Sequence, residues 1–139
     1  MIALVVAGLL MAVAVPNFGP TMDRSRLYAA TRDVASGLRH ARGMALMRGR
    51  DAELELNVDK HSYKVTGRAK PFSLPSQVRL SLYTTESETL DEGTGRIRFF
   101  PDGSSTGGRV TLVGGGQKRA VDVSWLTGEV KVRENPADD

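Results

Sequence analysis

The first fifty residues read MIALVVAGLL MAVAVPNFGP TMDRSRLYAA TRDVASGLRH ARGMALMRGR, and they set the layout of the whole chain. Residues 1–15 carry no charge and no strong hydrogen-bonding side chain, so they belong in lipid or in a protein core. As a helix they would be about 22 Å long, against the roughly 30 Å of a bilayer's hydrocarbon layer. We expect a helix with a membrane or core part over residues 1–18 and an amphipathic continuation over residues 19–50.

A secretory signal peptide is the first alternative for the apolar run, because its apolar centre has a similar length. The run lacks a preceding basic stretch, and residues 13–16 continue into a helical pattern without a clear cleavage site. We favour another interpretation, in which the chain starts inside a longer apolar helix whose beginning lies before Met1. The last alternative is an unrelated soluble protein in which the apolar run is a signal sequence.

The amphipathic part shows apolar residues at three- and four-residue steps, which is the spacing of a helix with one buried stripe. We expect the stripe to pack against a sheet through Leu27, Val34, Leu38, Ala41 and Ala45. Pro16 can kink a long helix without ending it, because neighbouring contacts cover the freed carbonyl.

Charge is unevenly spread along the chain. Residues 21–50 hold seven arginines against two aspartates, a net charge of +5, whereas residues 51–139 have a net charge of −2. Basic residues beside a membrane segment normally mark the cytoplasmic side. The chain has no cysteine, which excludes disulfides, thiolate nucleophiles and cysteine metal sites.

After Gly49 the pattern changes from helical spacing to the alternation of β-strands. Residues 53–66 predict a β-hairpin, and residues 86–95 read as a surface loop. Further short strands are expected at 78–83, 97–100, 109–113, 120–125 and 129–133. One long helix followed by about seven strands predicts an α+β fold, in which residues 51–139 form a β-rich domain with an antiparallel sheet against the helix.

No catalytic, cofactor or metal site is expected. His40 and His61 read as exposed and inert, because no carboxylate arrangement accompanies them as in a triad or zinc site. Residues 114–118, GGGQK, do not meet the spacing of a phosphate loop and predict a hairpin turn. Asp102 and its neighbouring serines are residue types that favour turns, so we expect them to form a turn and not a cation site. Trp125 is expected in the core.

Two stretches carry a family resemblance. Residues 12–18, AVAVPNF, resemble the end of the membrane segment in type IV pilins and type II secretion pseudopilins. Residues 96–108, RIRFFPDGSSTGG, resemble the signature of minor pseudopilin H and the related FimT-type minor pilins. The signature residues proper are Phe99, Phe100, Pro101, Asp102 and Gly103. The order of the two stretches and the helix-then-sheet layout agree with a type IV pilin-like fold.

The resemblance implies a single-pass protein of the bacterial inner membrane with its globular domain in the periplasm, which overrides the local charge rule. It also implies trimming and N-methylation by a prepilin peptidase, whose glycine, phenylalanine and glutamate would precede Met1. Small residues in the apolar run allow close approach of helices. The membrane and filament positions are Leu4, Val5, Gly8, Leu9, Leu10, Val13 and Pro16.

The resemblance leaves two functions open. In the first, the chain is a structural, non-enzymatic minor pseudopilin of the H type, which joins major and minor pseudopilins on the inner-membrane secretion platform and drives export of folded proteins. In the second, a FimT-type minor pilin binds DNA during transformation through basic residues near the carboxyl end. The candidates for that contact are Lys118, Arg119, Lys131 and Arg133. Glu129 stands where the DNA-binding relatives carry a basic residue, and acidic Glu134, Asp138 and Asp139 follow the basic residues, so secretion is the preferred interpretation.

Overall fold

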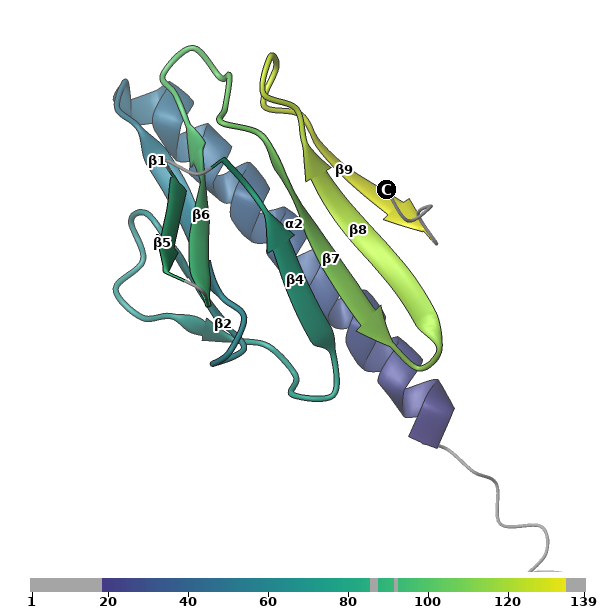
Figure 1. Ribbon diagram of the computed structural model, residues 1–139. Coiled ribbons are helices and arrows are strands. Elements are labelled where there is room, and N and C mark those ends of the chain that lie inside the picture. Colours follow the sequence, from purple (N-terminus) through teal and green to yellow (C-terminus); the bar gives the residue numbers. More distant parts are fainter. Residues whose placement is uncertain (1–18, 86–87, 92, 135–139) are drawn as a thin grey trace, which may run out of the picture.

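The computed structural model describes residues 19–85, 88–91 and 93–134. A single helix, α2 (Gly19–Arg48), is followed within these ranges by nine strands in two antiparallel sheets (Figure 1). The membrane and filament positions expected between Leu4 and Pro16 lie outside the described residues. In the part of the chain that is described, no helix is both long and apolar enough to cross a bilayer.

Helix α2 buries one stripe from Leu27 to Ala45. Thr31 is also buried in this stripe, and its hydroxyl donates to the Leu27 carbonyl at 2.7 Å. The helix ends at Gly49, which adopts a φ of 64° while its N–H donates to the Ala45 carbonyl at 3.0 Å. The stripe residues without any exposed surface are Leu27, Ala30, Val34, Leu38, Ala41 and Ala45.

The first sheet has the strand order β3-β2-β1-β6-β5. Its members are β1 (Ala52–Asn57), β2 (Ser62–Val65), β3 (Phe72–Ser73), β5 (Thr89–Asp91) and β6 (Thr94–Phe99). Buried and half-buried residues alternate along β1 and β6, as the period of a strand with one core face requires. The predicted hairpin over residues 53–66 is therefore confirmed as β1 and β2.

The second sheet has the strand order β4-β7-β8-β9. Its members are β4 (Arg79–Tyr83), β7 (Gly108–Gly114), β8 (Gln117–Val123) and β9 (Val130–Glu134). Gly115 and Gly116 form the two-residue turn between β7 and β8, with φ values of 56° and 76° that suit glycine. The glycine-rich stretch is thus a hairpin turn, as predicted.

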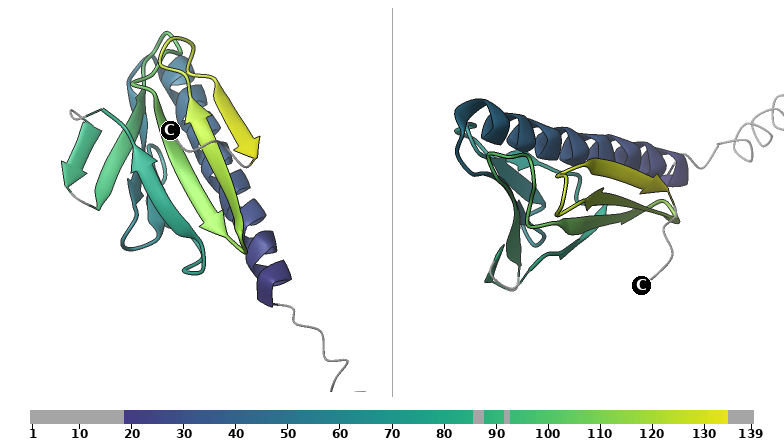
Figure 2. Two further views of the ribbon diagram at one scale, coloured as in Figure 1. Left: turned by 45° about the vertical axis from the view of Figure 1, so that its right-hand side comes forward. Right: turned by 90° about the horizontal axis from the view of Figure 1, so that it is seen from above.

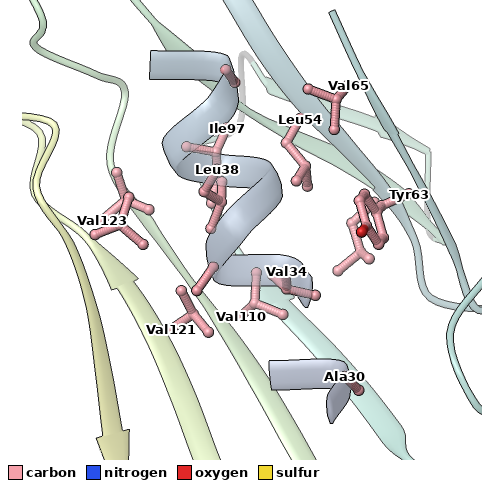
Figure 3. Close-up of a cluster of buried hydrophobic side chains, with 14 of the residues drawn as sticks. Ala30, Val34, Leu38, Leu54, Tyr63, Val65, Ile97, Val110, Val121 and Val123 are labelled. Atoms are coloured by element: carbon pink, nitrogen blue, oxygen red, sulfur yellow. The ribbon is translucent and has the colours of Figure 1, made fainter. Parts of the chain in front are cut away.

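The core lies where the helix crosses both sheets (Figure 2). Val34 and Leu38 of α2 lie between side chains of the first sheet, such as Leu54, and side chains of the second, such as Val110 (Figure 3). Phe99 at the end of β6 is the largest fully buried side chain. One helix therefore packs against both sheets. The predicted α+β class, with a helix packed on antiparallel strands, is confirmed.

Several details differ from the sequence predictions. The strands form two sheets rather than one, because β4 pairs with β7 and not with the first sheet. The expected surface loop over residues 86–95 contains β5 and the start of β6, where Glu88 is buried against the arginines of β6. Strand β8 ends at Val123, and Trp125 lies in the turn beyond it with 68% of its surface exposed, so its core assignment was wrong.

The two histidines are half-buried rather than exposed. His61 has a φ of 50°, and its Nε2 lies 3.0 Å from the Val78 carbonyl oxygen, which ties the β1–β2 turn to the start of β4. His40 lines a groove beside α2. The expectation of exposed histidines failed because His40 lies on the side of α2 next to the β2–β3 edge and His61 lies against the start of β4, and local sequence shows neither contact.

Candidate functional site

The signature loop, residues 99–108, joins the two sheets. Phe99 anchors it in the core, and the Phe100 N–H donates to the Ser104 carbonyl at 2.9 Å. The Gly103 N–H donates to the Phe100 carbonyl at 2.9 Å, which closes a tight turn around exposed Pro101 and Asp102. The loop is therefore a hydrogen-bonded turn with its aromatic end fixed inside the protein.

Asp102 stabilises this turn through its own side chain. Its Oδ1 accepts hydrogen bonds from the Ser104 N–H at 3.0 Å and the Ser104 hydroxyl at 2.6 Å. These bonds lower the pKa of Asp102, because they favour the charged carboxylate. The Asp102 side chain thus stabilises the turn, which is the role expected from the sequence.

A second loop, residues 124–129 between β8 and β9, packs against the signature loop. The Ser105 N–H donates to the Trp125 carbonyl at 2.9 Å, and the Ser105 hydroxyl donates to the Ser124 carbonyl at 3.0 Å. Gly128 closes the second loop by donating from its N–H to the Ser124 carbonyl at 2.8 Å. The two loops therefore form one hydrogen-bonded unit at one end of both sheets.

Arg42 connects this unit to the helix. Its Nε donates to the Gly103 carbonyl at 3.2 Å, and its Nη2 donates to the Thr127 carbonyl at 3.1 Å. The planar guanidinium suits two acceptors on different segments. Arg39, one turn earlier, donates to the Val130 carbonyl at 3.1 Å. The sequence analysis missed Arg42, although its place directly after Ala41 of the buried stripe was a signal that it borders the core.

The glycines of the signature follow from this packing. Gly103 and Gly107 adopt φ values of 91° and 73°, which side chains with a Cβ rarely adopt. A Cβ on Gly107 would also lie 3.1 Å from the Cβ of Trp125. The close approach leaves the Trp125 ring on the outside of the loop unit.

Large apolar side chains gather at the same end of the molecule. Trp125 and Leu126 are 68% and 64% exposed in the second loop, and Leu46 and Met47 are 46% and 79% exposed at the end of α2. Exposed aromatic and aliphatic side chains on a rigid loop are typical of protein contacts. We name these four residues the apolar tip. The sequence analysis missed it, because the exposure of Trp125 depends on the packing of the two loops.

The basic residues of the DNA-binding alternative have acidic or aromatic partners. Arg119 stacks 4.0 Å from the ring centre of Tyr28 and contacts Glu134 at 3.1 Å. Arg133 contacts Asp122 at 2.7 Å, and Lys131 lies 3.8 Å from Glu129. Lys118 is half-buried in β8. Arg119 faces the helix while the other three face outward, so the four cations do not form one phosphate-binding track.

A shallow groove runs between α2 and the β2–β3 edge. It encloses about 300 Å³ and is lined by polar groups of α2, including His40, and by the stacked rings of Tyr63 and Phe72, whose centres are 5.1 Å apart. Burial raises the pKa of Tyr63, and nearby Asp33 adds to this effect. Among residues 19–85, 88–91 and 93–134, no three metal-ligating side chains lie close enough together to hold an ion.

Comparison with known proteins identifies the family. Residues 30–128 match the family model described as type II transport protein GspH. The type II secretion system protein H of Xanthomonas campestris pv. campestris is 31% identical over 125 residues, which cover 90% of this chain and 72% of that protein.

Solved structures agree in fold. The minor pseudopilin EpsH from the type 2 secretion system of Vibrio cholerae superimposes with a TM-score of 0.62 at 11% identity, over 78% of this chain and 97% of that one. The type IV minor pilin FimU of Pseudomonas aeruginosa gives a TM-score of 0.61 at 13% identity, over 79% and 90%. The matched residues 30–128 include most of α2, the signature loop and every strand except β9. The chain therefore belongs to the GspH family of type II transport proteins.

Proposed function

We propose that this chain works as a structural minor pseudopilin of the H type in a type II secretion system. The observation that carries the proposal is the family match over residues 30–128, which takes in the signature loop and the strands that it joins. The relative from Xanthomonas is named for the same system. The paired state of Arg119, Lys131 and Arg133 gives no support to a DNA-binding role.

The apolar residues before α2 would place the protein in the inner membrane and then in the filament wall. In this proposal residues 1–18 continue the helix, residues 19–50 join it to the head, and residues 51–139 form the head in the periplasm. Prepilin peptidase would process and methylate the protein before assembly with major and minor pseudopilins on the secretion platform. Small residues such as Ala7 and Gly8 suit helix packing in lipid.

The apolar tip would contact a neighbouring subunit near the end of the pseudopilus. Its four side chains lie near the end of α2 that is farthest from the apolar run; the helix positions Leu46 and Met47, and the loop unit positions Trp125 and Leu126 before binding. Such preorganisation lowers the ordering cost of association.

Deletion of the gene and complementation test this function. Secretion of the folded substrates should stop in the deletion strain and return with the gene carried on its native upstream sequence. A Trp125→Ala, Leu126→Ala variant should restore less secretion than a control Leu90→Ala variant, which removes an apolar side chain that is 47% exposed in β5 of the first sheet. Normal secretion in the deletion strain, together with loss of DNA uptake, would contradict the proposal.

A further inference from the structure

The outward face of the second sheet carries an unusual surplus of positive charge. In β4, β7, β8 and β9 the residues that alternate with the core positions point away from α2, and register pairs place them side by side. We name this surface the basic face. Its cations are Arg79, Arg109, Lys118, Lys131 and Arg133.

Two carboxylates only partly balance these cations. Asp122 lies within the face and contacts Arg109 at 2.6 Å and Arg133 at 2.7 Å. Glu129 lies at the rim, 3.8 Å from Lys131. Lys118 has a further interaction of its own and is left out of the balance; the other four cations and the two carboxylates leave a net charge of +2 on the described residues of this face.

The outward face of the first sheet is different. Its Arg96 and Arg98 meet three carboxylates in a closed network, with Glu88 at 2.5 Å and 3.4 Å and with Glu53 and Asp51 within 4 Å. The two arginines on that face therefore pair with carboxylates of the same subunit. The surplus on the basic face is a local feature and does not follow from the overall composition.

Small side chains occupy the middle of the basic face. Ser81 and Thr111 pair in register across β4 and β7, and the next position of the row, Ala120 in β8, has no exposed surface. Four strands at about 4.8 Å spacing and five residues along each give a surface of roughly 14 Å by 14 Å. Long basic side chains border this floor on either side.

We propose that the basic face docks a carboxylate-rich surface of a neighbouring pseudopilin. This inference rests on the proposed function, which supplies a protein as the neighbour, and the charge surplus supplies its chemistry. The face fits DNA less well. A four-stranded sheet surface does not enter the major groove as a helix or two-stranded ribbon does.

The size of the face sets the strength of the contact. An area of about 200 Å² is a quarter of the roughly 800 Å² that each partner buries in a standard interface. The contact needs the high effective concentration that helix packing in the filament provides. It is therefore best tested in assembling cells.

The absence of cysteine from the chain allows a site-specific test. Ser81→Cys in the middle of the face carries a photo-cross-linker, and Ser76→Cys in an exposed turn is the control. Each is made in the full gene, in the deletion strain, alone and together with Arg79→Glu and Lys131→Glu. The matched control reversals, Lys60→Glu and Lys70→Glu, change the net charge equally in exposed turns of the first sheet's side.

We expect Ser81→Cys to cross-link another pseudopilin of the same system, with Ser76→Cys giving at most a tenth of the yield. The Arg79→Glu, Lys131→Glu pair should lower both cross-linking and secretion about tenfold, and the Lys60→Glu, Lys70→Glu pair should leave both within about twofold. Proteolysis of the purified variants checks that the fold is retained.

The outcomes separate the two proposals. If the wild-type gene restores secretion but the Arg79→Glu, Lys131→Glu pair behaves as wild type, or both reversal pairs fail alike, the docking inference is overturned and the proposed function stands. Cross-links to DNA in place of a pseudopilin also overturn it. If the wild-type gene does not restore secretion, the proposed function fails.

Discussion

Gly128 packs directly on the backbone of Gly103, so that a Cβ atom at position 128 would overlap the Gly103 carbonyl oxygen. Gly128 also has a φ of 70°, and the same carbonyl accepts a hydrogen bond from Arg42. The contact brings the signature loop, the β8–β9 loop and the helix together at a single point.

Replacement of Gly128 by alanine should therefore be severe. We expect Gly128→Ala to lower the free energy of unfolding by about 3 kcal/mol or more, because backbone strain adds to the overlap. Gly116→Ala is the matched control: its φ is 76°, but no atom lies within 4 Å of the added Cβ, so only about 1 kcal/mol should be lost. Urea unfolding followed by circular dichroism measures both. Equal losses would show that the contact with Gly103 has no energetic weight.

Two helix glycines should respond in opposite directions. A Cβ on Gly37 would lie 2.9 Å from Cδ1 of buried Leu54 and 3.1 Å from the Tyr63 ring, whereas nothing lies within 4 Å of a Cβ on Gly43. Gly43→Ala should raise the free energy of unfolding by up to about 1 kcal/mol through helix propensity. Gly37→Ala should lower it by about 1 kcal/mol, since crowding outweighs the same gain. Thermal unfolding of both variants and the wild type measures these changes in stability. An increase in stability in Gly37→Ala would contradict the close contact between the helix and the first sheet.

Glu88 should hold β5 on the first sheet. Its carboxylate is buried and contacts Arg96 at 2.5 Å and Arg98 at 3.4 Å. Glu88→Gln should cost about 2 kcal/mol, because two partly buried guanidinium groups lose the most buried of their counter-charges and keep only Glu53 and Asp51. Glu134→Gln removes an ion pair with Arg119 at an exposed position and should cost less than about 0.5 kcal/mol.

Hydrogen exchange of the β5 and β6 amides gives the local readout for this pair of variants. Protection should fall in Glu88→Gln and not in Glu134→Gln. Unchanged protection in both would mean that backbone pairing alone fixes β5.

The buried Tyr63 hydroxyl predicts a loss of stability in alkali. Its pKa is raised, chiefly by burial, so the folded protein keeps a proton that the unfolded chain releases above about pH 10. The stabilising contribution is complete below the unfolded pKa and is lost as the pH rises through the folded pKa. Unfolding experiments between pH 8 and about pH 11 should show a shallower decline in Tyr63→Phe than in the wild type. Tyr83→Phe, at an exposed ring, should follow the wild-type slope.

The elements that could be predicted from the sequence are those with a clear local period. The stripe from Leu27 to Ala45 and the alternation in residues 53–58 indicate one helix and a hairpin, because burial on one face imposes these spacings. The division into two sheets could not be predicted, since it depends on which strands pair across long distances. Trp125 shows the same limit: an aromatic residue favours the core, but the packing of Gly107 against its backbone turns the ring outward.

The functional surfaces were predicted less well than the fold. The signature loop was recognised from residues 99–103, and the structure adds its contacts with Arg42 and the β8–β9 loop. The basic face was hidden because its five cations come from four strands, and only the register brings them to one side. In the sequence Lys131 and Arg133 form a short basic tail. The sequence does not show that Asp122 contacts both Arg133 and Arg109.

Packing of α2 against both sheets also determines how the subunit carries mechanical load. A pull or push on the first turn of the helix acts parallel to a buried stripe about 27 Å long, from Leu27 to Ala45. Such a load is resisted in shear by the whole interlocked stripe at once, whereas a load that peels off one edge strand breaks its contacts one after another. Under such a load, the β-rich domain and helix α2 would move together as one rigid body.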